Sequence, residues 1–165
     1  MLTACRDTMT GGDNDMFQRD YILRMIEELG AALIALRKAI FGGTAPAGEV
    51  EDTLRRAASG AGMDIELARA VSAEALPAMV APTGEVEPAR CWVLAEALMT
   101  DGVHQLELGK HDPARSSLAK AAVLFDLVGP GGAFLTGFPE ARVRIAEIEG
   151  LLAEIRELPG GIGDG

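Results

Sequence analysis

Residues able to do chemistry are few in this chain, and their spacing gives them little to do together. His104 and His111 are its two histidines. His104 and Glu107 share a helix face, but no further ligand lies at a spacing that suits zinc. We therefore interpret His104 and Glu107 as a solvated pair and His111 as a loop residue.

Nucleophile and phosphate-binding motifs are missing from the sequence as well. Cys5 and Cys91 lack metal-ligand spacing and an identifiable base, and there is no Gly-x-Ser-x-Gly motif. The glycine-rich stretch 129–137 lacks the lysine and the following Ser or Thr of a phosphate loop, and no strand precedes it. Neighbouring carboxylates such as Glu27 and Glu28 are interpreted as solvated charges. We expect no catalytic residue, no metal site and no cofactor, hence a protein that is not an enzyme.

Composition narrows the classes of partner. The formal net charge is −10 and the pI is about 4.6, which argues against nucleic acid because a phosphate backbone requires a basic surface. No apolar run reaches the roughly 18 residues of a membrane span. Two cysteines without a disulfide pattern suit a reducing cytoplasm. We expect a cytoplasmic protein whose partner is a protein or peptide.

Two amphipathic stretches joined by a short turn predict a helical hairpin. The apolar residues at helical spacing are Leu94, Leu98, Gly102 and Leu106 in the first stretch, and Ala114, Leu118, Ala121, Phe125 and Val128 in the second. Gly109 can end the first helix in the left-handed conformation. Asp112 before Pro113 is a predicted N-cap of the second helix.

The hairpin segment 95–128 resembles a tetratricopeptide repeat, which has a repeat length of about 34 residues. The matching positions are Gly102, Ala114, Leu118 and Ala121. The departures are Leu98, Gln105 and Asp126, where the family has tryptophan, tyrosine and proline. Any helical hairpin with small residues at its seam is the alternative. From the close packing expected of this seam, we predict that Gly102 faces the second helix near Ala121.

In tetratricopeptide-like stacks the first helix of each hairpin lines a concave surface. The resemblance therefore implies partner-binding residues at Glu96, Met99, Val103, Leu106 and Glu107. Two carboxylates around a methionine would suit a peptide with a basic residue beside an apolar anchor. The alternative is that the long N-terminal helix fills this groove within its own molecule.

That N-terminal helix is predicted from Asn14 or Asp15 to the Gly42-Gly43 pair. Apolar residues cover more of the circumference of this helix than one neighbouring helix would bury. It is interpreted as a core helix, a homodimer seam or a helix on a membrane surface, the last disfavoured by the acidic balance. The residues of the dimer seam would be Ile22, Met25, Leu29 and Leu36.

The first residues of this helix, MFQRDYILRMIE from Met16 to Glu27, resemble the start of a family of uncharacterised bacterial proteins. The resemblance implies a helical region with a tetratricopeptide-like hairpin from Met16 to about Leu158, and no known activity. Residues 1–15 are expected to be a disordered extension, with the natural start at Met16. Residues 159–165 are expected to form a flexible tail.

Short helices are predicted between these elements. They cover 49–58, 64–70 with Asp64 as N-cap, and a segment capped by Ser72 and interrupted near Pro77. Their expected packing residues are Leu54, Ile65, Leu67, Val71, Leu76 and Met79.

The last predicted helix, 139–158, has one apolar and one charged face. The apolar residues are Ala141, Ile145, Ile148, Leu152 and Ile155, and the charged ones are Glu140, Arg144, Glu147, Glu154 and Glu157. A polar outer face suits a helix that closes the end of a stack.

The sequence thus predicts one all-α domain, 16–158, built as a tetratricopeptide-like helical hairpin array with a long N-terminal helix and a C-terminal capping helix. The function predicted is a non-catalytic interaction module. The alternative is a small-ligand binder or an enzyme with a pocket between helices.

Overall fold

The computed structural model describes residues 10–81, 84, 87–129 and 139–158. Within these ranges every regular secondary-structure element is a helix, which confirms the all-α prediction. The helices are α1 Thr10–Phe41, α2 Ala47–Gly60, α3 Ile65–Ala70, α4 Leu76–Val80, α5 Pro88–Glu107, α6 His111–Val128 and α7 Glu140–Glu157.

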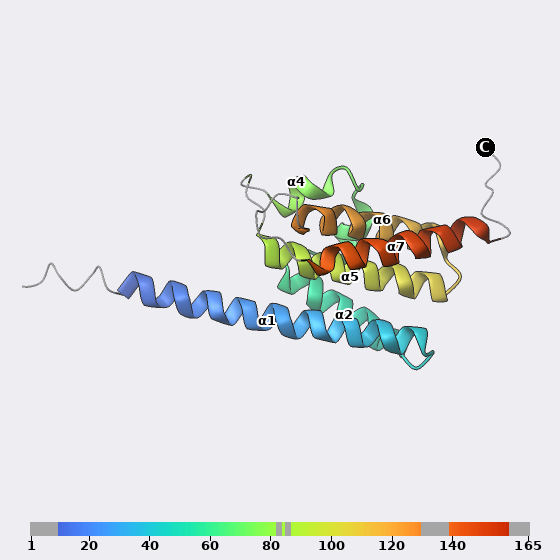
Figure 1. Ribbon diagram of the computed structural model, residues 1–165. Helices are drawn as coiled ribbons and strands as arrows, with labels where there is room; N and C mark the ends of the chain where they lie inside the picture. The colour runs from blue at the N-terminus through green and yellow to red at the C-terminus, as the bar shows by residue number, and fades with distance from the viewer. Residues whose placement is uncertain (1–9, 82–83, 85–86, 130–138, 159–165) are drawn as a thin grey trace, which may run out of the picture.

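Helix α5 lies at the centre of the fold. It packs against α1, α2 and α6, while α7 packs along α6 (Figure 1). Every residue from Val93 to His104 is buried. Such a helix has no wet face, so its polar side chains must find partners within the protein.

Helices α5 and α6 form the predicted hairpin. Gly109 has a φ of 76°, which confirms it as the left-handed end of the first helix. The predicted cap at Asp112 is wrong, because α6 begins at His111 and has no side-chain cap. Asp112 lies inside the first turn, where its carboxylate accepts a hydrogen bond from Arg115 at 3.0 Å.

The hairpin seam is as close as its small residues predict, but its register differs. A Cβ atom added at Gly102 would lie 2.6 Å from Cγ of Leu118 and 3.3 Å from the backbone oxygen of Ala114. Leu118, one turn earlier than Ala121, is therefore the residue that faces Gly102. Near the other end of the hairpin, Trp92 meets Phe125 edge-on with ring centroids 5.1 Å apart.

Helix α1 is longer than predicted at its start. It begins at Thr10, so residues 10–15, expected to be disordered, are helical, and residues 1–9 lie outside the described ranges. It ends at Phe41, and Gly43 has a φ of 71°, which confirms the glycine stop. In Figure 1 the N-terminal half of α1 extends past the other helices, while its C-terminal half lies against them.

The connecting helices follow their predicted caps in part. Asp64 is confirmed as the N-cap of α3, because its Oδ1 accepts from the backbone N–H of Glu66 at 2.7 Å. Ser72 Oγ accepts from the backbone N–H of Ala75 at 3.2 Å, one turn before α4 begins. Pro77 lies in the first turn of α4 instead of interrupting a helix, since no intrahelical N–H is required there.

The packing residues predicted for these helices mostly point inward. Leu54, Ile65 and Leu76 are buried, and Val71 and Met79 are half-buried. Leu67 is the exception, because it is exposed.

Helix α7 has the apolar face predicted for it. Ala141, Ile148 and Ile155 are buried, and Ile145 and Leu152 are half-buried. The charged face is wet at Glu140, Glu147, Glu154 and Glu157. Arg144 departs from the prediction, since its side chain reaches inward to a carboxylate of α5.

Candidate functional site

The predicted partner-binding residues of α5 are mostly in the core. Glu96, Met99 and Val103 are buried, Leu106 is half-buried, and Glu107 is exposed. Helix α1 packs along this side of α5. The expectation of an open groove is therefore corrected: the long first helix occupies it within the same molecule, and of the five residues only Glu107 is exposed to solvent.

Glu96 is held by arginines from two other helices. Its Oε2 forms an ion pair with Nη1 of Arg37 from α1, and its Oε1 accepts from Nε of Arg144 from α7 at 2.8 Å. Arg37 also donates to Oγ1 of Thr100 at 3.0 Å. We call Arg37, Glu96, Thr100 and Arg144 the Glu96 cluster. A buried charge is tolerated when it is paired in this way, so the cluster fixes α1 and α7 to α5.

Asp101 gathers partners from the opposite side of α5. Its Oδ1 accepts from Nη2 of Arg69 at 2.7 Å and its Oδ2 accepts from Oγ of Ser117 at 2.6 Å. Arg69 also donates to Glu51 at 2.9 Å. Burial lowers the pKa of Arg69, but the hydrogen bonds to Asp101 and Glu51 outweigh it and raise that pKa overall. This Asp101 cluster joins α2, α3, α5 and α6 through side chains that have each other as partners.

Lys120 of α6 is buried and directed at the end of α3. Its Nζ donates to the backbone oxygens of Ala68 at 3.1 Å and Arg69 at 2.6 Å. Burial lowers its pKa, and the charge of Asp101 opposes that change. The amine satisfies carbonyl groups that a helix end leaves without partners, so we interpret it as a structural cap.

Cys91 and His104 are also buried within α5. The Cys91 thiol lies 3.7 Å from the backbone oxygen of Leu124, and burial raises its pKa to about 12. It is therefore a neutral thiol near pH 7, the unreactive form. The predicted solvated pair of His104 with Glu107 is wrong for the histidine, since His104 is 8% exposed.

The described residues offer neither a metal site nor a membrane-spanning helix. They contain no group of three His, Cys, Asp or Glu side chains placed to hold a metal ion. None of their helices is long and apolar enough to cross a membrane.

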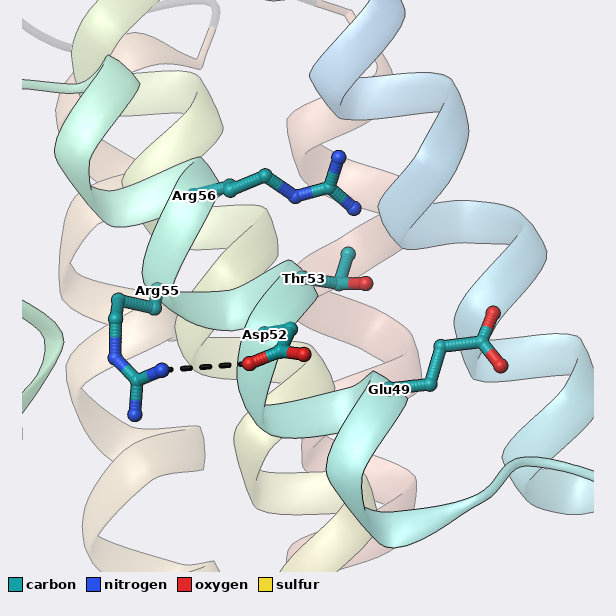
Figure 2. A pocket seen from close by; sticks show the side chains of 5 residues that line it. All are labelled: Glu49, Asp52, Thr53, Arg55 and Arg56. Atoms are coloured by element: carbon teal, nitrogen blue, oxygen red, sulfur yellow. Dashed lines mark hydrogen bonds and ion pairs between the residues drawn. The ribbon is translucent and has the colours of Figure 1, made fainter.

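A shallow groove runs between α1 and α2. It measures about 390 Å³, and alanines 32, 35 and 39 of α1 form one wall. Glu49, Thr53 and Arg56 of α2 line its other side, and Figure 2 shows these three side chains on the side of α2 that faces α1. Arg55 points away and pairs with Asp52 at 3.4 Å. The wall of small side chains leaves room for an apolar group from outside.

The residues predicted for self-association face their own molecule instead. Leu36 is buried, and Met25 and Leu29 are half-buried. A Cβ atom added at Gly60 would lie 2.5 Å from Cδ1 of Leu29, which places Leu29 against α2. The side chain of Ile22 lies outside the described part. The predicted seam is therefore corrected at these three positions: it is largely an intramolecular contact.

Apolar side chains are nevertheless exposed on α1, at positions that the sequence argument did not select. Phe17 is 73% exposed, Tyr21 is 71% exposed and Leu23 is 47% exposed. Phe17 and Tyr21 are one helical turn apart and lie on the half of α1 that projects beyond the other helices (Figure 1). Their spacing was a usable signal, but apolar periodicity alone does not say which stripe of a broad apolar helix is covered.

No family model matches this chain, and no curated protein or solved structure matches it either. Function is therefore inferred from the burial, the contacts and the exposed surface of the protein itself.

Proposed function

We propose that this protein is a non-catalytic interaction module whose docking element is the N-terminal half of α1. The observation that carries the proposal is the exposure of Phe17 and Tyr21 on one face of a projecting helix. Large aromatic side chains are the usual anchors of protein interfaces. Neighbouring exposed aromatics on one face mark a contact site more often than scattered ones do.

The remaining helices serve as the base that holds this element. In our proposal α5 and α6 are a tetratricopeptide-like hairpin, supported by the close approach at Gly102, and α7 closes its outer side. The Glu96 cluster attaches the C-terminal half of α1 to that base. A partner that binds the N-terminal half would thus meet a helix with a fixed direction.

The chemistry of the interior favours this function over catalysis. Glu96, Asp101, Arg69 and Lys120 all make hydrogen bonds or ion pairs to other parts of the fold. A catalytic pocket needs polar groups that converge on open space. The groove between α1 and α2 is the place where the alternative function, small-ligand binding, would occur, with the alanines of α1 on one wall and Glu49, Thr53 and Arg56 of α2 on the other.

Charge supports a protein over a nucleic acid as the partner. The net charge of −10 disfavours a nucleic acid. We therefore propose a protein or peptide as the partner, with an apolar surface that receives Phe17 and Tyr21.

Site-specific photo-crosslinking tests the proposal. A photoreactive residue replaces Tyr21 in one variant and Glu154, exposed on α7, in a matched control. Each variant is illuminated both as pure protein and in cell extract. We expect discrete adducts from position 21 that weaken when Phe17→Ser is added. Equal adduct patterns from positions 21 and 154 would contradict the proposal.

A further inference from the structure

One face of α1 carries a regular series of exposed residues. Counting along the helix in alternating steps of four and three residues gives Phe17, Tyr21, Arg24, Glu28, Ala31 and Ala35, and all six are exposed. Steps of four and three place side chains on a single stripe, as in a coiled coil. The stripe faces away from the core side of α1, which carries Leu33 and Ile40.

The order of residues along this stripe makes it complementary to a second copy of the stripe that runs in the opposite direction. Laid antiparallel about a point midway between Arg24 and Glu28, the stripe places Arg24 opposite Glu28 of a second copy. The same alignment places Tyr21 opposite Ala31 and Phe17 opposite Ala35. Each large ring meets a small methyl group and each positive charge meets a negative one. A surface that matches its own copy through a two-fold axis is the requirement for a symmetric dimer.

We propose that the partner of this face is a second copy of the same chain, with the two α1 helices antiparallel in this alignment. The inference rests on the proposed function and names its partner. A parallel arrangement would place Arg24 opposite Arg24 and Glu28 opposite Glu28, and like charges in direct contact are unfavourable. It would also set ring against ring and leave the alanine positions without a side chain to fill them.

The groove beside the alanines strengthens this choice of partner. Ala35 is both a member of the stripe and part of the groove wall between α1 and α2. A Phe17 ring from the second copy, arriving at Ala35, therefore meets an open space of about 390 Å³. An aromatic ring gains much of its binding energy from burying its large apolar surface. The two-fold axis repeats this contact, so each copy gives one ring and receives one.

The antiparallel dimer would also give the projecting half of α1 a surface to pack against. The N-terminal half of α1, which includes positions 17 and 21, extends past the other helices of its own molecule in Figure 1. In the dimer it lies along the C-terminal half of the other copy's α1, whose opposite side packs against its own α2 and α5. Each α1 is then covered on both sides over its middle section.

Charge reversal tests the alignment in the full-length protein. Sedimentation equilibrium should give a dimer, and Arg24→Glu or Glu28→Arg alone should raise its dissociation constant at least about tenfold, because each creates two like-charge contacts. The double variant Arg24→Glu with Glu28→Arg should restore the parental constant within about threefold, since the pairs are exchanged. Glu107→Arg, an exposed change on α5, is the matched control and should have no effect.

Cysteine pairing tests the direction of the helices. In a Cys5→Ser background, Tyr21→Cys with Ala31→Cys should form a disulfide-linked dimer under mild oxidation, because positions 21 and 31 of one helix lie about 15 Å apart and cannot bridge within the chain. Neither single variant should cross-link to the same extent. Efficient cross-linking of Tyr21→Cys alone would indicate parallel helices and overturn the alignment.

The outcomes separate this inference from the proposed function. A monomer at high micromolar concentration would overturn the dimer, and adducts from position 21 to another protein would then leave the proposed function standing. A monomer without such adducts would overturn both. A dimer unaffected by the charge reversals would show that copies associate through another surface, which also overturns this inference.

Discussion

Helix α5 and the N-terminal half of α1 invert the usual distribution of side chains in opposite ways. Helix α5 buries Glu96, Thr100 and Asp101, whereas α1 exposes Phe17 and Tyr21. The buried polar groups have partners from surrounding helices, so their presence is explained within one molecule. The exposed rings have no such explanation in the described fold. A buried charge with partners is therefore explained by the architecture, whereas the exposed rings on the projecting helix are the basis of the proposed docking element.

The largest effect should follow from removing the carboxylate of Glu96. Glu96→Ala leaves the buried Arg37 without its anion and removes one of the two carboxylates paired with Arg144, and breaking a buried pair in this way costs about 3–5 kcal/mol. The free energy of unfolding, measured with urea, should fall by that amount. Glu107→Ala, on the exposed end of the same helix, should change it by less than about 0.5 kcal/mol. Equal losses in the two variants would mean that Glu96 does not hold the helices together.

A smaller loss is expected at the hairpin seam. Gly102→Leu inserts a side chain where a Cβ atom alone would lie 2.6 Å from Leu118, and overpacking costs about 1–3 kcal/mol. Thermal unfolding should show the loss, and Leu118→Ala in the same chain should recover part of it. Gly150→Ala is the control, because a Cβ atom there meets nothing within 4 Å. A Gly102→Leu protein that melts like the parent would contradict this seam.

Alkaline pH should reveal the burial of Cys91 in α5. Burial raises its pKa in the folded state from the ordinary 9.0 to about 12. Above pH 9 the unfolded chain loses this proton while the folded chain keeps it, so its contribution to stability is full below pH 9 and declines as pH rises. At pH 10 the decline is about 1.4 kcal/mol.

The measurement compares the parent with Cys91→Ala by urea unfolding at pH 8 and pH 10. The parent should lose about 1.4 kcal/mol more than the variant over this interval. Comparing slopes with pH removes the constant cost of the deleted thiol. Parallel losses in the two proteins would show that Cys91 reaches solvent.

The smallest effect on stability is expected from removing the exposed rings of α1. This small effect separates their role most directly from that of the buried polar residues of α5. Phe17→Ser with Tyr21→Ser should change the unfolding free energy of the monomer by less than about 0.5 kcal/mol, because neither ring is in the core. The same variant should weaken association, as followed by light scattering over a range of concentrations. A large loss of monomer stability would show that these rings pack inside their own molecule.

Local features of the fold were predictable from short stretches of sequence. The glycine stops at Gly43 and Gly109, the cap at Asp64 and the apolar face of α7 all depend on residues within a few positions of each other. Backbone conformation and helical periodicity are local properties, so the sequence contains what is needed to assign them. The predicted cap at Asp112 is wrong by two residues, because Lys110 holds the N-cap position of α6 and makes no side-chain cap.

What tertiary structure alone decided is which faces meet. Arg37, Glu96 and Arg144 are far apart in the chain, and no spacing rule connects them. An arginine in an amphipathic pattern is assigned to the solvent, although its long side chain can reach a buried carboxylate. Because the sequence does not give the neighbours of a side chain, Glu96 was predicted as a contact residue and Phe17 was not selected. The helices and several of their ends could be predicted from the sequence, because these follow from local energetics. The packing of α1 on α5 decided which side chains of α1 stay exposed, because burial depends on every other element of the fold.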